Sequence, residues 1–439
     1  DVSFPLEVDW RYPTTEKQSH QLRMRTRLQN APIPMVGLEE LSVALEATSW
    51  LTIRDGRPVE GIANITGLAA RDQGLSGNSR IRFELTGLSS ARASFESLQL
   101  QLPGIRVTGA GGGFHFDGER VTARLPAVDL VAEPLSAFLK PFDLDPKLER
   151  FLSLNKPALG ISEVLLDWHL EGAPLINAEV DSFAMQAANS IPQIGPVSGE
   201  LFLHGSRGWF HFHSEAAIFS LPDVFDEPWR DQSLTGVLAF SHKDEGLVIK
   251  GHDLKVQDDV QNVVGALLLD LSRDREQKIQ LEMTVKAGTE ALRGLLPSVL
   301  DSEVASFLNR SIEKVFVENG RISYSAPLGA NVDQARSELA MRLPLKNYRF
   351  KPLADWPAFI GRTGVVDFAN RRARIDFQKS EFGGLFINRV VAWQPFEYSS
   401  QINLRGDLVG DASTAIEILD AAGVKPDALG SKIALEGSL

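Results

Sequence analysis

Apolar and polar residues alternate along most of this chain with a period of two. The stretch ALLLDLSRDREQKIQLEMTV at 266–285 alternates, passes through the polar sequence SRDREQ, and then alternates again. Because successive side chains of a β-strand point to opposite faces, this pattern predicts a hairpin with one apolar face. The same pattern predicts strands at 80–85, 96–103, 338–345 and 363–378. Short turns rich in Gly, Asp, Asn and Arg separate most of these runs, which is typical of an antiparallel meander.

Helical spacing of apolar residues is limited to short segments. The best candidate is 288–316, where three-and-four spacing predicts a helix on either side of Pro297. Segments 145–154 and 413–423 are shorter candidates. We expect these helices to interrupt the sheet rather than to build a second layer.

Internal similarity indicates a repeating architecture. Segments 113–126 and 209–222 both contain FHF, followed at the same distance by Leu-Pro, and segments 234–249 and 362–377 are similar to each other. Repetition of this kind predicts units that stack along an axis. We therefore expect three β-groove repeat blocks: 1–150; 151–290, with the FHF and EPW elements; and 291–439, where a short helix precedes the strands.

The predicted fold is mainly β: an elongated, twisted antiparallel sheet curled into a hydrophobic groove, with a few short helices. At roughly 15 residues for each strand and turn, the chain supplies on the order of 30 strands. A sheet of that size does not stay open and flat, so we expect its apolar face to roll inward. Two sheets packed face to face are the commoner arrangement for alternating strands. Periodicity leaves open whether side chains or a ligand fill the interior, although the 24 phenylalanines and the scarcity of helices favour a ligand slightly.

Composition excludes several classes of function. The 57 acidic residues outnumber the 45 basic ones, giving a net charge of -12. The basic residues do not form the clusters that nucleic acid or an anionic membrane surface requires. The absence of cysteine excludes disulfides, thiolate metal sites and cysteine nucleophiles. No apolar run of about eighteen residues appears, and both ends fall within strand-like patterns, so we expect a segment of a longer protein whose membrane anchor lies outside it.

Histidines alternate with phenylalanines at 209–215 and raise a metal hypothesis. Two imidazoles and a carboxylate on one strand face can supply three zinc ligands, and the preceding strand can add a fourth. The similar segment at 113–126 has His115 but carries Asp117 in place of a second histidine. The element therefore recurs without the ligands, and we expect a polar outer face with no metal bound. The candidate ligands are His204, His211, His213 and Glu215.

Catalytic and phosphate-binding motifs are weak. GAGGG at 109–113 lacks a following Lys-Ser or Lys-Thr and leads into a strand, so we interpret it as a connection between strands. The chain contains no GxSxG nucleophile motif, and acidic pairs such as Asp258 and Asp259 are typical of turns. We predict no catalytic residue, no cofactor and no enzymatic activity.

The order of elements in 295–329 and 338–384 resembles the repeating block of the YhdP family, in the AsmA-like group that also includes TamB. Segment 198–240 is similar to the same pattern, whereas Phe307 stands where relatives often carry Trp. The matching elements are a Leu-Pro opening, a helix, a Gly-containing strand, a Trp-Pro element and a hairpin. They fall here at Leu296 and Pro297, the helix to Lys314, Gly320 with Ile322 and Tyr324, Trp356 with Pro357, and Gly364 through Phe377 in one block, and at Leu221, Pro222, Pro228 and Trp229 in the other.

The resemblance implies a bridge-like lipid-transfer protein in the periplasm of a Gram-negative bacterium. Such a protein is anchored in the inner membrane by an N-terminal helix, which lies outside this segment, and moves phospholipids between the inner and outer membranes. Envelope proteins are possible partners. The alternative is an envelope scaffold or assembly factor with a protein-filled β core, and a metal-dependent or carbohydrate-active β-repeat enzyme is a third class. The residues expected to line the groove and contact lipid are Ile81, Phe83, Leu98, Leu100, Phe114, Phe116, Leu201, Leu203, Phe210, Phe212, Leu267, Leu269, Leu281, Met283, Ile322, Tyr324, Leu339, Met341, Val366, Phe368, Ile375 and Phe377.

Overall fold

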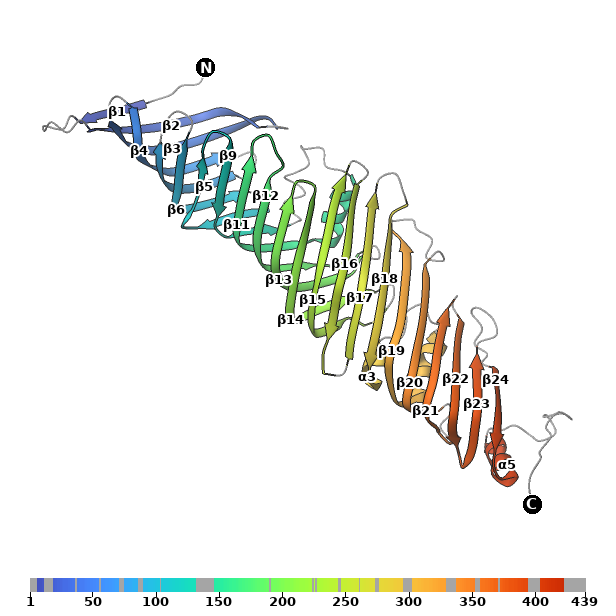
Figure 1. Ribbon diagram of the computed structural model, residues 1–439. Coiled ribbons are helices and arrows are strands. Elements are labelled where there is room, and N and C mark those ends of the chain that lie inside the picture. The colour runs from blue at the N-terminus through green and yellow to red at the C-terminus, as the bar shows by residue number, and fades with distance from the viewer. Residues whose placement is uncertain are drawn as a thin grey trace. The chain divides into compact units, whose positions relative to one another are not determined.

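The computed structural model consists mostly of β-strands, which belong to one antiparallel sheet (Figure 1). The expected fold class, mainly β with an antiparallel sheet and a few short helices, is confirmed. Among the described residues, no helix is both long enough and apolar enough to cross a membrane. The structure describes residues 6–11, 19–35, 38–54, 57–70, 75–85, 90–102, 104–131, 146–188, 191–222, 225, 227–243, 246–259, 261–272, 276–294, 302–328, 337–351, 356–369, 372–393 and 403–421.

The chain divides into two compact units. Unit 1 contains residues 1–188, 193–213 and 239–243, and unit 2 contains residues 189–192, 214–238 and 244–439. The three repeat blocks were expected from internal similarity of the sequence. A division by contacts does not test that similarity, so the blocks stay a prediction.

The first six strands of unit 1 pair as antiparallel neighbours in chain order, as a meander requires. The helix of this unit, α2, spans Pro146–Asn155, where the sequence predicted one. The strands are β1 Leu6–Arg11, β2 Ser19–Met35, β3 Leu38–Arg54, β4 Arg57–Ala70, β5 Leu75–Leu85, β6 Ala91–Leu102, β7 Ile105–Gly109, β8 Gly112–Phe116, β9 Arg120–Leu125, β10 Val128–Val131, β11 Ala158–His169, β12 Leu175–Met185, β13 Gln193–His204 and the first half of β14 Arg207–Ser220.

The GAGGG sequence marks a break in the strand pattern of unit 1. One edge of β6 pairs with both β7 and β8, and one edge of β11 pairs with both β9 and β10. Gly109 and Gly111 have φ values of 147° and 80°, which other residues adopt only with strain. A Cβ at Gly109 would also lie 2.4 Å from Pro126, which lies between β9 and β10. The glycines therefore allow two short strands to follow one another, as the interpretation of a strand connection requires.

Unit 2 contains the second half of β14 and the strands that follow it. The last residues of β15, 239–243, belong to unit 1. The strands after β14 are β15 Trp229–Lys243, β16 Gly246–Gln257, β17 Gln261–Ser272, β18 Lys278–Ala287, β19 Ile312–Pro327, β20 Glu338–Phe350, β21 Phe359–Ala369, β22 Arg372–Phe382, β23 Leu385–Trp393 and β24 Asn403–Val409. The hairpins predicted around 266–285 and 363–378 are present as β17–β18 and β21–β22.

The helices of unit 2 are α3 Thr289–Gly294, α4 Ser302–Ser311 and α5 Ala412–Ala421. The prediction that a helix reaches Lys314 is wrong, because the helix ends at Ser311 and β19 begins at the next residue. Lys314 is paired with Arg349 of β20 instead, so sheet hydrogen bonding replaces helical bonding there. Leu296 and Pro297 lie outside the described residues.

One face of the sheet carries cross-strand ion pairs. Examples are Arg25 with Glu46 at 3.2 Å in unit 1 and Arg342 with Asp367 at 3.0 Å in unit 2. Exposed pairs of this kind contribute little to stability. Asp376 differs because it is buried, and it accepts two hydrogen bonds of 3.1 Å from Nε of Arg389. These bonds lower the pKa of the Asp376 carboxyl below its usual value.

We predict that Asp376→Asn destabilises the chain at about pH 7 and that the difference shrinks in acid. The folded-state pKa lies below the unfolded value of about 3.9, so the stabilisation is present above that pH. It is lost as the pH falls through the lowered folded-state pKa. Urea unfolding of both proteins at about pH 7 and about pH 2 measures the gap. Asp253→Asn, at a side chain that is 88% exposed, is the control and should show no gap of this size. An equal gap for Asp376→Asn at both pH values would contradict the assignment.

Candidate functional site

A continuous row of apolar residues and glycine crosses the strands of unit 1. Cross-strand pairing from β2 to β13 places one residue of each strand directly beside the next. At Gly61, a Cβ would lie 2.5 Å from the ring of Phe83, so the glycine leaves space for that ring. The row is Leu22, Leu51, Gly61, Phe83, Ala93, Phe114, Ala123, Leu166, Ile176 and Leu203.

The adjacent row, which points to the opposite face, is polar. It is shifted by one residue on each strand, and apart from Leu175 each member is charged or polar. Since neighbouring residues of a strand face opposite ways, the two rows separate an apolar face from a polar face. The polar row is Thr52, Glu60, Glu84, Arg92, His115, Thr122, Asp167, Leu175 and His204.

The His-Phe strand follows the same division. Phe210 and Phe212 are buried, and their rings lie 5.7 Å apart. His211, His213 and Glu215 are exposed, and Nε2 of His213 lies 3.5 Å from Oγ of Ser198. Within the described ranges, no group of three or more His, Asp or Glu side chains is placed to hold a metal ion.

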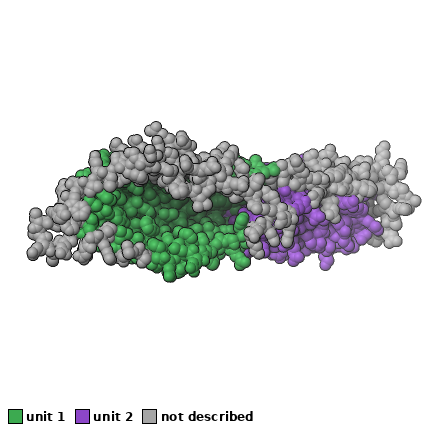
Figure 2. Space-filling model, turned by 90° about the horizontal axis from the view of Figure 1, so that it is seen from above, with its two compact units in different colours: residues 1–188, 193–213, 239–243 green, residues 189–192, 214–238, 244–439 purple. Residues whose placement is uncertain are grey.

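The apolar face of unit 1 is only partly covered by the protein's own side chains. Most members of the apolar row are half-buried, and Phe114 is 40% exposed. Large apolar side chains in a filled core are normally almost completely buried. The space-filling view shows that the described part of unit 1 has a hollowed face (Figure 2). The apolar row therefore remains partly accessible.

The apolar face of unit 2 is covered. Helices α3 and α4 pack on β19, and Leu292 and Leu308 from these helices are buried. On the same face, Ile322, Leu343 and Phe377 are each 2% exposed. A small cavity of about 30 Å³ lies between the helices and strands β19–β22. A space of this size does not admit an acyl chain, so protein fills this part of the face.

Specific hydrogen bonds hold α3 on β19. The Thr289 hydroxyl donates to the carbonyl of Val315 at 3.2 Å and accepts from its N–H at 2.9 Å. Arg293 donates to the carbonyl of Ile312 at 2.9 Å. The start and the end of this short helix are therefore both attached to the strand that it covers.

A buried tyrosine lies on the apolar face of unit 2. The hydroxyl groups of Tyr348 and Ser380 are hydrogen-bonded, and the Tyr348 ring stacks on Phe377 with 4.8 Å between ring centroids. Burial raises the pKa of Tyr348 to about 12. The hydroxyl therefore stays neutral at physiological pH, so this face gains a polar pair but no charge.

The predicted groove-lining residues lie on the apolar face of each unit, but their surroundings differ. In unit 1, Ile81, Phe83, Leu98, Leu100, Phe116, Leu201 and Leu203 are half-buried, Phe114 is exposed, and Phe210 and Phe212 are buried. In unit 2, Leu267 and Val366 are half-buried, whereas Leu269, Leu281, Met283, Ile322, Tyr324, Leu339, Met341, Phe368, Ile375 and Phe377 are buried. Contact with lipid stays a prediction for both sets.

Sequence reasoning missed the contribution of β11 and β12 to the apolar row. β11 has a register shift between Ile161 and Glu163, which inserts one extra residue relative to β12. Strict alternation from Ile161 would select Leu165 for the apolar face. The structure places Leu166 there and leaves Leu165 beside Arg124 on the polar face, 42% exposed. The available signal in the sequence was the adjacent pair Leu165 and Leu166, because neighbouring residues of a strand face opposite sides.

Comparison with known proteins gives one match. The family model described as YhdP protein matches residues 12–429, which is nearly the whole chain. No curated protein and no solved structure matches. Of the elements that resembled this family, the structure contains the hairpin β21–β22 and the Gly-containing strand β19. The chain belongs to the YhdP family.

Proposed function

We propose that this chain conducts phospholipids between the inner and outer membranes of a Gram-negative envelope, along the apolar face of its sheet. Acyl chains lie against the apolar row, and headgroups remain in water beside it. The transfer is passive binding and sliding, without a catalytic step. The proposal places the chain in the periplasm.

The observation that carries this proposal is the half-exposed apolar row of unit 1. A row of leucine, isoleucine and phenylalanine that remains accessible would be costly without an occupant, because exposed apolar surface is unfavourable in water. Covering it with hydrocarbon removes that cost. Membership of the YhdP family, which the chain shares over residues 12–429, supports an envelope role of this kind.

The energetics favour movement along the row. Burial is worth about 0.8 kcal/mol per methylene, so a two-chain lipid leaves an apolar environment for water only slowly. Neighbouring strands lie about 4.8 Å apart, so a tail that advances by one strand exchanges one set of apolar contacts for a similar set. Similar contacts at each step prevent any single position from becoming a trap.

Unit 2 requires a further step in this mechanism. Helices α3 and α4 cover its apolar face, so passage of lipid there needs the helices to move away from β19. The alternative function is an envelope scaffold or assembly factor with a protein-filled β core. The filled region of unit 2 is consistent with that alternative as well. The open face of unit 1 favours lipid conduction over that alternative.

We predict that lipid contacts Leu166 and not Leu165. These neighbours have the same side chain and lie on opposite faces of β11, so they form a matched pair. A photo-reactive residue replaces one leucine at a time in cells, and mass spectrometry measures lipid adducts on the purified protein. Adducts at 166 should clearly exceed those at 165. Equal adducts at both positions, or none at 166, would exclude the proposed lipid path.

We also predict that loosening α4 admits lipid to unit 2. Leu308→Asp places a charge in the buried contact of α4, whereas Asn309→Asp changes the exposed next residue and serves as the control. With a photo-reactive residue at Leu345, beneath the helix, lipid adducts should be scarce in the parent chain and rise with Leu308→Asp only. Circular dichroism checks that the sheet is retained. No rise in a folded Leu308→Asp chain would mean that the helices do not control access to this face.

A further inference from the structure

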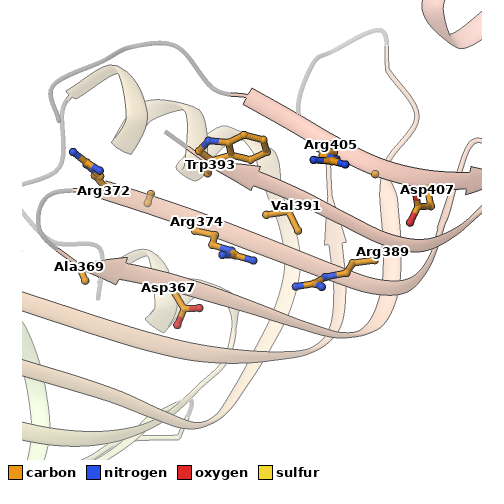
Figure 3. Close-up of a pocket in the computed structure, with 11 residues that line it drawn as sticks. Asp367, Ala369, Arg372, Arg374, Arg389, Val391, Trp393, Arg405 and Asp407 are labelled. Atoms are coloured by element: carbon orange, nitrogen blue, oxygen red, sulfur yellow. The ribbon is translucent and has the colours of Figure 1, made fainter. Parts of the chain in front are cut away.

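The polar face of unit 2 carries a pocket of about 760 Å³ that the lipid path does not use. Strands β21 to β24 form it, and its polar lining includes Arg372, Arg374, Arg389, Arg405 and Asp407. Figure 3 shows the guanidinium groups of Arg374 and Arg389 extending toward each other from neighbouring strands. These arginines are far apart in the sequence, and strand pairing brings them together.

The positive charge of this pocket is only partly neutralised. Asp376 pairs with Arg389 and lies 3.7 Å from Arg374, and Asp367 pairs with Arg342. Each of these carboxylates therefore already has an arginine partner.

Arg372 and Arg405 are different. Both are exposed, and neither has a carboxylate partner among the residues that the structure describes. Structural ion pairing therefore accounts for Arg374 and Arg389 but leaves two guanidinium groups at the same pocket without a function. In a chain whose net charge is -12, a local excess of arginine is unusual.

The shape and lining of the pocket fit a small ligand. Trp393 and Val391 form an apolar wall beside the arginines (Figure 3). The volume lies within the range of small-molecule sites, which combine apolar walls with a few placed polar groups. An aromatic wall next to guanidinium groups suits a ligand with an anionic part and an uncharged part.

We propose that this pocket binds a ligand that carries phosphate. Phosphate presents several oxygens around one centre, so more than one guanidinium can donate to it, and arginine matches its geometry with two parallel hydrogen bonds. Arg372 and Arg405 donate hydrogen bonds to the phosphate. Arg374 and Arg389 add positive charge to the same pocket, where their contacts with Asp376 hold them in position. The site lies on the polar face of unit 2, so it does not overlap the apolar face of that unit.

Two sources of phosphate are possible, and one experiment separates them. Calorimetric titration of the 439-residue chain with pyrophosphate tests a soluble ligand. Flotation with vesicles of phosphatidylcholine, with or without phosphatidylglycerol, tests an anionic headgroup. Each assay compares the parent chain with the double variant Arg372→Gln and Arg405→Gln. Arg92→Gln is the control, because Arg92 is an exposed arginine on the polar face of unit 1.

The double variant should bind the phosphate source about tenfold more weakly or worse, since two charge-assisted contacts are removed. Arg92→Gln should bind like the parent chain, and higher salt should weaken binding. Pyrophosphate binding identifies a soluble ligand, and dependence on phosphatidylglycerol alone identifies a headgroup. If neither source binds, or if the double variant, with an unchanged melting temperature, binds as the parent does, the proposal is overturned.

Discussion

The register between neighbouring strands is the constraint on which this structure depends. A slip of one residue at any pairing would turn a whole strand over and move its leucines and phenylalanines to the polar side. In unit 1 the pairing keeps the apolar position aligned from Leu22 on β2 to Leu203 on β13. Where a strand contains an extra residue, as β11 does after Ile161, the bulge restores the alignment. The sheet of unit 1 therefore has one apolar surface.

The two units use that surface differently. In unit 1 the protein leaves the apolar row half-exposed, and in unit 2 it covers the face with α3, α4 and close aromatic packing such as Phe359 on Phe382 at 4.1 Å. The attachment of α3 through Thr289 gives this cover a defined position on β19. An accessible apolar surface and a protein core can thus be built from the same strand pattern. Short helices of the same chain decide which of the two a given unit contains.

The sequence predicted the facing of strands wherever the alternation was regular. It separated Phe210 and Phe212 from the exposed His211 and His213 correctly, because burial alternates regularly along that part of β14. It made no prediction for Leu166, where the register shift reverses the alternation, and it was wrong at Lys314, where pairing with β20 ends the helical pattern early. Burial of the unit 2 residues under α3 and α4 is a tertiary contact that periodicity does not contain. The arginine pocket was also missed, since it gathers residues from β22, β23 and β24 that form no basic run.

The central claim is that hydrocarbon, and not protein, completes the apolar face of unit 1. Native mass spectrometry of the gently purified chain tests it most directly, because retained ligands appear as defined mass additions. The account predicts additions with the masses of phospholipids, which disappear when Leu203 on the apolar face is changed to aspartate and persist when exposed His204 beside it is changed in the same way. A chain that carries no lipid under conditions where it remains folded would contradict the account.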